Sequence, residues 1–208
     1  MKPYYQDEWV TIYHGDCRDI LPDLPKVDLV LTDPPYGINK ADWDVEFVMP
    51  PEDIKTDIMG LMPGVWNLLK VTSKIQAYDK WLRFRWQIIA HLVNGMTHGA
   101  IGWGNYIPCL VYVADGITLN HKGTDCKDIV VGSEYKPAHP SPKPERAIAW
   151  FIERLSNSGN FILDPFLGSG TTAYCAKKLN RHCIGIEIEE KYCEIAAKRC
   201  SQGVFDLR

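Results

Sequence analysis

The sequence has no long apolar run. No stretch of about 18 residues is free of charged side chains, so we expect no membrane-spanning helix and no membrane partner. Residues 1–8 contain no apolar signal-peptide core, and we therefore expect a cytoplasmic protein. With 46% hydrophobic and 24% charged residues among 208, the composition excludes a disordered or collagen-like chain and fits one globular domain.

Paired cysteines and an excess of basic charge are also missing. The seven cysteines include no Cys-x-x-Cys pair, and most lie among apolar runs. Buried, reduced thiols are therefore favoured over disulfides or a metal site. The formal net charge of -3 gives no bulk attraction to nucleic acid, so binding to DNA would need a local basic face.

The order of apolar segments predicts an α/β fold in a single domain, 1–208. Strands are expected at 10–13 and 27–31, with a short helix or turn at 18–24 between them. The C-terminal part is expected to alternate helix and strand, at 144–155, 161–163, 171–179, 183–187 and 190–200. This βαβα order predicts a mostly parallel sheet with helices on both faces.

The middle of the chain is less regular. Helix-like spacing covers 54–69 and 80–93, and a strand is expected at 107–113. Residues 114–138 are polar and have no clear period, so we expect a short irregular insert there. Long loops inside compact domains are often functional, which makes the insert a candidate for recognition of a partner.

A glycine-rich turn follows the strand at 161–163 and opens the next helix. Gly168 and Gly170 permit a tight turn and a close approach to a ligand. Glu187 ends the following strand, at the place where an acid accepts hydrogen bonds from ribose in nucleotide-binding βαβ units. The Gly-x-Gly-x-x-Gly and Gly-Lys-Ser/Thr patterns of phosphate-binding loops are missing. The turn therefore favours a ligand with ribose but no phosphate, and a plain chain reversal is the alternative.

The segment Asp33-Pro34-Pro35-Tyr36 lies just beyond the strand at 27–31, where α/β sheets place their active sites. Proline has a fixed φ and no N–H, so the two prolines make a stiff loop with carbonyls available to a ligand. The Asp33 carboxylate adds an acceptor and Tyr36 adds a stacking plane. This combination suits a planar ring that carries an amino group, although a proline turn with a packed tyrosine would have the same composition.

Four segments in this order resemble the β class of amino-group DNA methyltransferases. Residues 33–36 resemble the catalytic motif, and residues 164–171 are similar to the S-adenosylmethionine motif. Residues 139–144 are similar to the family's His-Pro-Thr-x-Lys-Pro segment, and residues 14–17 resemble the segment that contacts the cofactor adenine. The catalytic motif precedes the cofactor motif, which is the permuted order of this class. The resemblance implies a Rossmann-like S-adenosylmethionine-dependent methyltransferase fold.

The resemblance also implies a set of site residues. Asp33, Pro34, Pro35 and Tyr36 would form the catalytic loop, with the Asp33 carboxylate and the Pro34 carbonyl accepting the two N–H bonds of the target amino group. Among the cofactor contacts, Asp16 would bind the adenine amino group, Glu187 the ribose, and Ser141 and Lys143 the methionine carboxylate. The full implied cofactor set is Asp16, Cys17, Asp33, Ser141, Lys143, Asp164, Phe166, Gly168, Ser169, Gly170, Thr171 and Glu187. No metal is implied.

The implied partner is double-stranded DNA. A base inside a duplex cannot reach the Asp33 loop, so the target must flip out of the stack. Trp43 either lines that pocket or belongs to the core, and Trp103, Asn105 and Tyr106 either contact bases or form a packed turn. Residues 114–138 are the candidate DNA-recognition segment. Candidate phosphate contacts, each equally compatible with a solvated surface, are Lys80, Arg83, Arg85, Lys122, Lys127 and Lys136.

The function implied by the resemblance is site-specific methylation of DNA. The N6 amino group of adenine is favoured, since Asp heads the motif in adenine members of the class whereas cytosine members commonly have Ser. The alternatives are N4-cytosine methylation, the same chemistry on RNA or a protein glutamine, and a non-catalytic cofactor-binding partner subunit. The sequence leaves open whether a cognate restriction nuclease exists. The short insert favours a homodimer, because a second subunit would extend the DNA contact surface.

Overall fold

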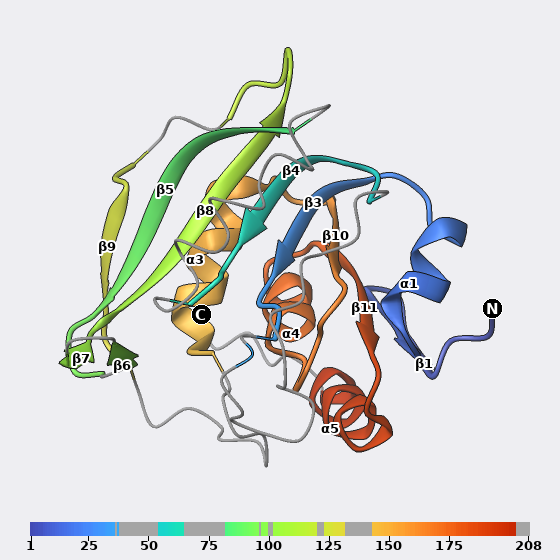
Figure 1. The fold of residues 1–208 in the computed structure, drawn as a ribbon. Coiled ribbons are helices and arrows are strands. Elements are labelled where there is room, and N and C mark those ends of the chain that lie inside the picture. Colours follow the sequence, from blue (N-terminus) through green and yellow to red (C-terminus); the bar gives the residue numbers. More distant parts are fainter. Residues whose placement is uncertain are drawn as a thin grey trace.

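A nine-stranded sheet organises the part of the chain that the computed structural model describes, which is residues 1–35, 37, 54–64, 82–95, 97–99, 102–119, 123–131 and 143–202. The strand order is β1-β2-β11-β10-β3-β4-β8-β5-β9 (Figure 1). The strands are β1 (Tyr5–Gln6), β2 (Val10–His14), β3 (Val27–Thr32), β4 (Thr56–Leu61), β5 (Leu82–Leu92), β8 (Tyr106–Ala114), β9 (Cys126–Ile129), β10 (Phe161–Asp164) and β11 (His182–Glu187). A separate small hairpin is formed by β6 (Thr97–Gly99) and β7 (Gly102–Gly104).

The centre of the sheet is parallel. Strands β2, β11, β10, β3 and β4 pair in parallel with one another, whereas β1 is antiparallel to β2 and β8 is antiparallel to both β4 and β5. The parallel strands are covered on both faces, and β3 accordingly has five buried residues out of six. Their carboxyl ends therefore meet at one edge of the sheet, toward which the arrowheads of β3 and β4 point in Figure 1. We call it the carboxyl edge.

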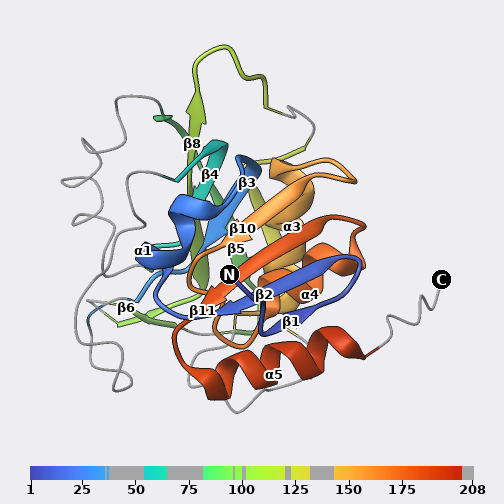
Figure 2. The same ribbon diagram turned by 90° about the vertical axis from the view of Figure 1, so that its right-hand side faces the viewer.

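Helices cover both faces of the sheet, as predicted (Figure 2). On one face lie α1 (Cys17–Ile20) and a 3-10 turn (Leu21–Asp23), which pack with the core around Met59. On the other face lie α3 (Glu145–Leu155), α4 (Thr171–Lys178) and α5 (Glu190–Ser201). The apolar stripe predicted for α3 is buried, including Ile148, Phe151, Ile152 and Leu155.

The helix prediction for the middle of the chain is wrong where the structure describes it. Residues 56–61 form β4 and residues 82–92 form β5. Strand β4 is buried on both faces over its last residues, so its apolar run has no alternation that would distinguish strand from helix. In β5 apolar residues occupy every second position from Leu82 to Leu92, which is a strand pattern that the helix prediction overlooked. A bulge between Phe84 and Trp86 shifts the strand register, and these two side chains are exposed. Residues 65–69 and 80–81 of the two predicted helices lie outside the described part of the chain.

The predicted irregular insert, 114–138, contains a strand. Residues 114–119 lie at the edge of the sheet opposite the carboxyl edge, because Ala114 ends a strand that is antiparallel to β4. Strand β9 then runs parallel to β5 and returns to the carboxyl edge. The remaining positions of the insert, 120–122 and 132–138, lie outside the described residues. Among the described residues of the insert, the end of β9 is the part that reaches the carboxyl edge.

All seven cysteines are free thiols, and six of them are buried while Cys126 is exposed. Burial raises the pKa of Cys17 to about 11 and that of Cys200 to about 12, which keeps these thiols protonated near neutral pH. In the portion of the chain covered by the structure, no helix is long and apolar enough to cross a membrane.

Candidate functional site

The carboxyl edge brings together residues from three predicted motifs. Strands β2, β11, β10 and β3 are consecutive neighbours in the sheet. Asp16 follows β2, Glu187 ends β11, Asp164 ends β10, and Asp33 follows β3 directly. Motifs that are more than a hundred residues apart in sequence therefore share one edge, which is where ligands bind in parallel α/β sheets.

The glycine-rich turn is built against the end of β11. The Gly168 N–H donates to Glu187 Oε2 over 2.7 Å, and the Leu167 N–H donates to the Ile186 carbonyl over 2.9 Å. Gly168 and Gly170 have φ values of 55° and 80°, in the left-handed region that glycine adopts without strain. Gly170 is the residue that caps α4 at its N-terminus. The predicted close turn between strand and helix is thus present.

Glu187 is held as an acceptor at the end of β11. Its residue exposure is 8%, and burial raises the pKa of its carboxyl group, although backbone N–H donors oppose this shift. Oε1 accepts the Glu189 N–H over 2.8 Å, and Oε2 accepts the Gly168 N–H. Because a carboxylate oxygen can accept more than one hydrogen bond, the group keeps capacity for the two hydroxyls of a ribose.

Gly170 also permits a close contact between α4 and α5, which leads to a prediction. A Cβ at Gly170 would lie 2.7 Å from the Ala196 Cβ, whereas a Cβ at Gly159, which has a similar φ of 82°, would meet nothing within 4 Å. Gly159→Ala should therefore cost only backbone strain, about 1 kcal/mol, and Gly170→Ala should cost about 2–4 kcal/mol because overpacking is added. Chemical denaturation of both variants measures the difference, and equal losses would contradict the close contact.

Asp164 joins the glycine-rich turn to the strand that carries Asp33. The carboxylate is buried, with 3% of the residue exposed, and it accepts from Thr32 Oγ1 over 2.9 Å and from the Phe166 N–H over 3.2 Å. Burial raises its pKa to about 6, although hydrogen bonds from Thr172, Thr32 and Phe166 oppose the shift. Thr32 directly precedes Asp33, so this bond fixes the two motifs relative to one another. A direct contact between Asp164 and the cofactor stays a prediction.

The raised pKa of Asp164 predicts a dependence of stability on pH. A carboxyl group whose folded pKa lies above its unfolded value stabilises the fold at low pH, and this contribution is lost as the pH rises through about 6. Relative to Asp164→Asn, which does not titrate, the wild type should lose on the order of 2 kcal/mol of unfolding free energy between pH about 4 and about 7. Chemical denaturation of both proteins between pH about 4 and about 7 measures their unfolding free energies. A difference between the two proteins that does not change with pH would contradict the raised pKa of Asp164.

The Asp33 carboxylate forms an ion pair with the ammonium group of Lys143. Their side chains are 24% and 14% exposed, so the pair is shielded but reachable from solvent. Pro34 is buried and Pro35 is half-buried, which fixes the start of the loop. The structure thus brings Asp33 of the 33–36 motif into contact with Lys143 of the 139–144 motif. Tyr36 and Ser141 lie outside the described residues.

Asp16 and Cys17 lie at the start of α1, next to the end of β11, because the preceding Gly15 N–H donates to the Glu187 carbonyl over 2.9 Å. Asp16 caps this helix by accepting the Arg18 N–H over 2.9 Å, and its carboxylate also pairs with the Arg18 guanidinium. These bonds lower the pKa of Asp16. Cys17 is buried under the helix. Asp16 is therefore an ionised acceptor at the carboxyl edge, whereas any contact of Cys17 with a ligand would be made by its backbone.

Sequence reasoning missed a buried arginine that supports the turn. Arg199, on α5, is 5% exposed, and its guanidinium donates to Glu145 Oε1 over 2.6 Å and to Thr171 Oγ1 over 3.0 Å. It also reaches the Ser169 carbonyl over 3.4 Å. Ser169 and Thr171, which are in the predicted cofactor set, are both buried and are held by these hydrogen bonds from Arg199. The sequence did contain a signal for this buried arginine, because Arg199 lies on the apolar side of the helix predicted at 190–200.

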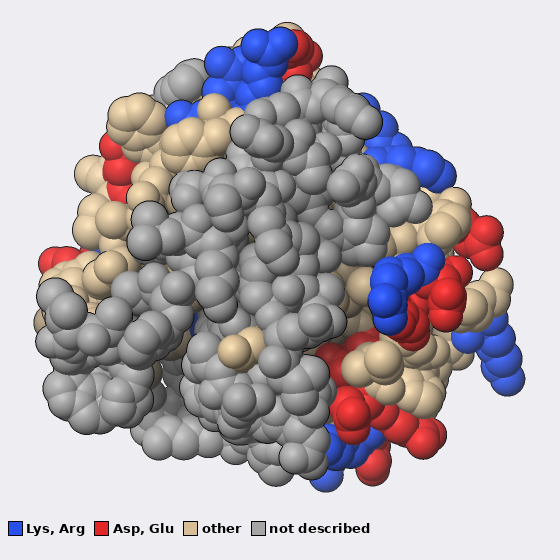
Figure 3. Space-filling view, viewed as in Figure 1, with Lys and Arg blue, Asp and Glu red and all other residues tan. Residues whose placement is uncertain are grey.

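The candidate DNA contacts divide between the two edges of the sheet. Arg83 and Arg85 lie at the edge opposite the site and pair with Asp115 at 3.2 and 3.9 Å. Asn105 and Tyr106 lie at the carboxyl edge, at the start of β8. Lys127 is exposed on β9. Trp43, Lys80, Lys122 and Lys136 lie outside the described residues, as does the side chain of Trp103. On the described surface in Figure 3, Lys and Arg occur in separate groups beside acidic residues.

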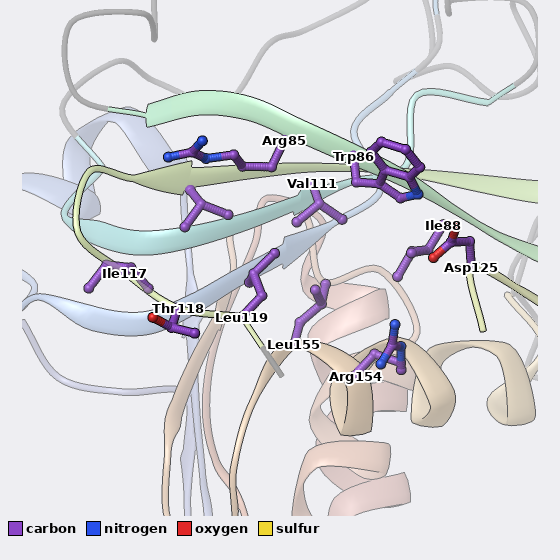
Figure 4. A pocket seen from close by; sticks show the side chains of 11 residues that line it. Arg85, Trp86, Ile88, Val111, Ile117, Thr118, Leu119, Asp125, Arg154 and Leu155 are labelled. Atoms are coloured by element: carbon purple, nitrogen blue, oxygen red, sulfur yellow. The ribbon is translucent and has the colours of Figure 1, made fainter. Parts of the chain in front are cut away.

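A cavity of about 570 Å³ lies apart from this site (Figure 4). It is formed by β5, β8, residues 117–119 and the C-terminal end of α3, with Trp86, Val111 and Leu155 among its lining residues. Among the predicted catalytic and cofactor residues that the structure describes, none lines this cavity. The cavity therefore takes no part in the arrangement at the carboxyl edge.

Comparisons with known proteins agree with this geometry. The model of a DNA methylase family of the N6/N4 type matches residues 117–198. The type II methyltransferase M.HinfI of Haemophilus influenzae is 44% identical, in an alignment that covers 96% of this chain and 70% of that protein.

Two solved structures share the fold. The complex of M1.HpyAVI with SAM matches with a TM-score of 0.71 and 23% identity, covering 92% of this chain and 99% of that chain. The PvuII DNA methyltransferase, described as cytosine-N4-specific, matches with a TM-score of 0.72 and 16% identity, covering 95% of this chain and 88% of that one. These matches confirm the predicted fold class.

Proposed function

We propose that the chain, which belongs to the N6/N4 DNA methylase family, transfers a methyl group from S-adenosylmethionine to the N6 amino group of a flipped adenine at a specific DNA site. Membership makes it an amino-group DNA methyltransferase. The observation that carries the finer proposal is the Asp33 carboxylate, which lies at the end of β3 and is tied to the glycine-rich turn through Thr32 and Asp164.

The residues at the carboxyl edge fit S-adenosylmethionine. Glu187 offers acceptors for the ribose hydroxyls, and Asp16 offers one for the adenine amino group. The turn at 168–170 has no phosphate-binding lysine, in keeping with a ligand that has no phosphate. Lys143 carries the charge opposite to that of the methionine carboxylate. When bound, this cofactor supplies an electrophilic methyl group on a sulfonium centre.

Asp33 and Pro34 would activate the target amino group. The lone pair of an adenine amino group is delocalised into the ring, so the nitrogen is a poor nucleophile. By accepting one N–H each, the Asp33 carboxylate and the Pro34 carbonyl would draw the nitrogen toward a tetrahedral geometry and localise its lone pair. Fixed acceptors and alignment supply the rate enhancement in such a site. Tyr36 would stack on the base, and no cysteine needs a catalytic role.

The choice of adenine rests on the Asp at the head of the 33–36 motif. The second candidate is N4-cytosine, because a protein described as cytosine-N4-specific shares this fold. The same acceptor pair could bind either amino group.

We further propose double-stranded DNA as the substrate. We propose a homodimer because the insert is short, and a cognate nuclease as a partner because M.HinfI is a type II methyltransferase.

Transfer of a labelled methyl group tests this proposal. The full chain would be incubated with methyl-labelled S-adenosylmethionine and duplex DNA, and the DNA digested to nucleosides. We expect the label in N6-methyldeoxyadenosine. Label in N4-methyldeoxycytidine would establish the second candidate. Cofactor binding in calorimetry without transfer to any DNA would contradict both and favour a partner subunit.

A further inference from the structure

A chain of three hydrogen-bonded side chains lies at the carboxyl edge, beyond the predicted catalytic loop. His91 Nδ1 is 2.7 Å from Asp128 Oδ1, and His91 Nε2 is 2.9 Å from Asn105 Nδ2. The three residues come from the end of β5, the end of β9 and the residue before β8. Nothing in the proposed methyl transfer uses them.

The sheet fixes this chain of side chains. His91 is directly opposite Asp128 in the parallel pair β5–β9 and opposite Tyr106 in the antiparallel pair β5–β8. The backbone carbonyl of Asn105 accepts the Leu92 N–H over 2.6 Å, which anchors Asn105 beside His91. The arrangement is therefore held by strand register as well as by the side chains. Asn105 itself is exposed.

The hydrogen bonds determine which way the Asn105 amide faces. An ionised aspartate can only accept, so His91 donates from Nδ1 to Asp128, and in the neutral imidazole Nε2 then accepts from Asn105 Nδ2. This uses one N–H of the amide. The second N–H and Oδ1 have no partner among the described residues, so the exposed amide presents one donor and one acceptor side by side. That pair matches the N7 acceptor and N6 donor that adenine shows in the major groove.

The position suits contact with the duplex around a flipped base. Strand β8 is two strands from β3, and β9 is four strands from it. With strands about 4.8 Å apart, Asn105 and Asp128 lie roughly 10 and 19 Å along the edge from the Asp33 loop. This range corresponds to about three to six base pairs of DNA. The end of β9 is also where the insert at 114–138 returns to the carboxyl edge.

We infer that Asn105 reads an adenine near the target base through the major groove, and that Asp128 and His91 are positioning residues that fix its amide. The inference rests on the proposed function, because it requires the chain to bind duplex DNA at the carboxyl edge. It assigns the DNA-reading part of this region to the ends of β5, β9 and β8, and excludes residues 114–119 at the opposite edge.

The test compares site preference between variants. Wild-type protein would methylate a pool of randomised duplexes, and sequencing that detects methylated bases would give its recognition site. Asn105→Ala should then lose discrimination for an A·T pair at one position of that site by roughly 10- to 100-fold, with other positions unchanged. Asp128→Ala should relax the same position to a smaller extent, because the amide is retained but no longer fixed.

Asn94→Ala is the matched control. Asn94 lies at the same end of β5, but both ends of its amide are used by the backbone of Val131, at 2.8 and 2.7 Å. This variant should keep the wild-type site preference. Unchanged preference in Asn105→Ala, or a uniform loss at every position, would overturn the inference while methylation by wild type upholds the function. If wild type modifies no DNA, the proposed function fails and the inference fails with it.

Discussion

Asp33→Ala should lower kcat for methyl transfer by about 10²- to 10³-fold, the typical cost of removing one fixed electrostatic partner of a reacting group. The variant removes the acceptor that would localise the lone pair of the target nitrogen, whereas Glu187 and the glycine-rich turn remain intact. The dissociation constant for S-adenosylmethionine should therefore change much less than kcat. Single-turnover transfer of labelled methyl groups and calorimetry on the same preparation measure the two quantities.

Asp28→Ala is the control for Asp33→Ala. Asp28 is on the same strand, but it lies at the opposite end of β3 and binds the Phe161 N–H over 2.7 Å. It should retain wild-type kcat. Asp33→Asn keeps an acceptor but loses the charge that pairs with Lys143. The kcat of this variant should therefore lie between those of wild type and Asp33→Ala. Transfer by Asp33→Ala at a rate within a few-fold of wild type would contradict the role given to this carboxylate.

Arg199→Met should lower the free energy of unfolding by about 3–5 kcal/mol, the usual cost of breaking a buried ion pair by removing one partner. The guanidinium holds Glu145 on α3 and Thr171 at the start of α4, so its loss releases the support behind the glycine-rich turn. Affinity for S-adenosylmethionine should fall as well. Urea denaturation and calorimetry below the unfolding transition separate the two effects.

Arg181→Met distinguishes support of the turn from general destabilisation. Arg181 is also well bonded, to the Ser156 carbonyl over 2.9 Å and the Leu179 carbonyl over 2.6 Å, but it lies at the other end of α4 from the turn. The Arg181→Met variant should have a lower free energy of unfolding than wild type but the same affinity for S-adenosylmethionine. Equal affinities in Arg199→Met and wild type would show that Arg199 stabilises the fold and does nothing for the cofactor site.

The local parts of the site could be predicted from the sequence. Gly168 and Gly170 between a strand and a helix, with Glu187 at the end of the next strand, follow a pattern whose geometry is set within one βαβ unit. The two prolines after Asp33 end β3 for a reason that is local to the backbone. These features needed no knowledge of tertiary structure.

The parts that sequence reasoning missed depend on contacts between distant segments. The bond from Thr32 to Asp164 and the chain from Asp128 through His91 to Asn105 exist only because of strand order and register. Arg199 finds Glu145 only when α5 and α3 pack on the same face. Strand β5 was missed although apolar residues occupy every second position from Leu82 to Leu92, a strand pattern that the helix prediction overlooked. Local spacing cannot predict side-chain pairs that the sheet topology creates.

A crystal structure with S-adenosylmethionine and a target duplex tests the central claim most directly. The account predicts that the Asp33 carboxylate accepts a hydrogen bond from the flipped base, whose amino nitrogen lies about 3–3.5 Å from the transferable methyl carbon. It also predicts that Glu187 contacts the ribose of the cofactor. A methyl carbon remote from the Asp33 loop, with the base bound elsewhere, would contradict the account.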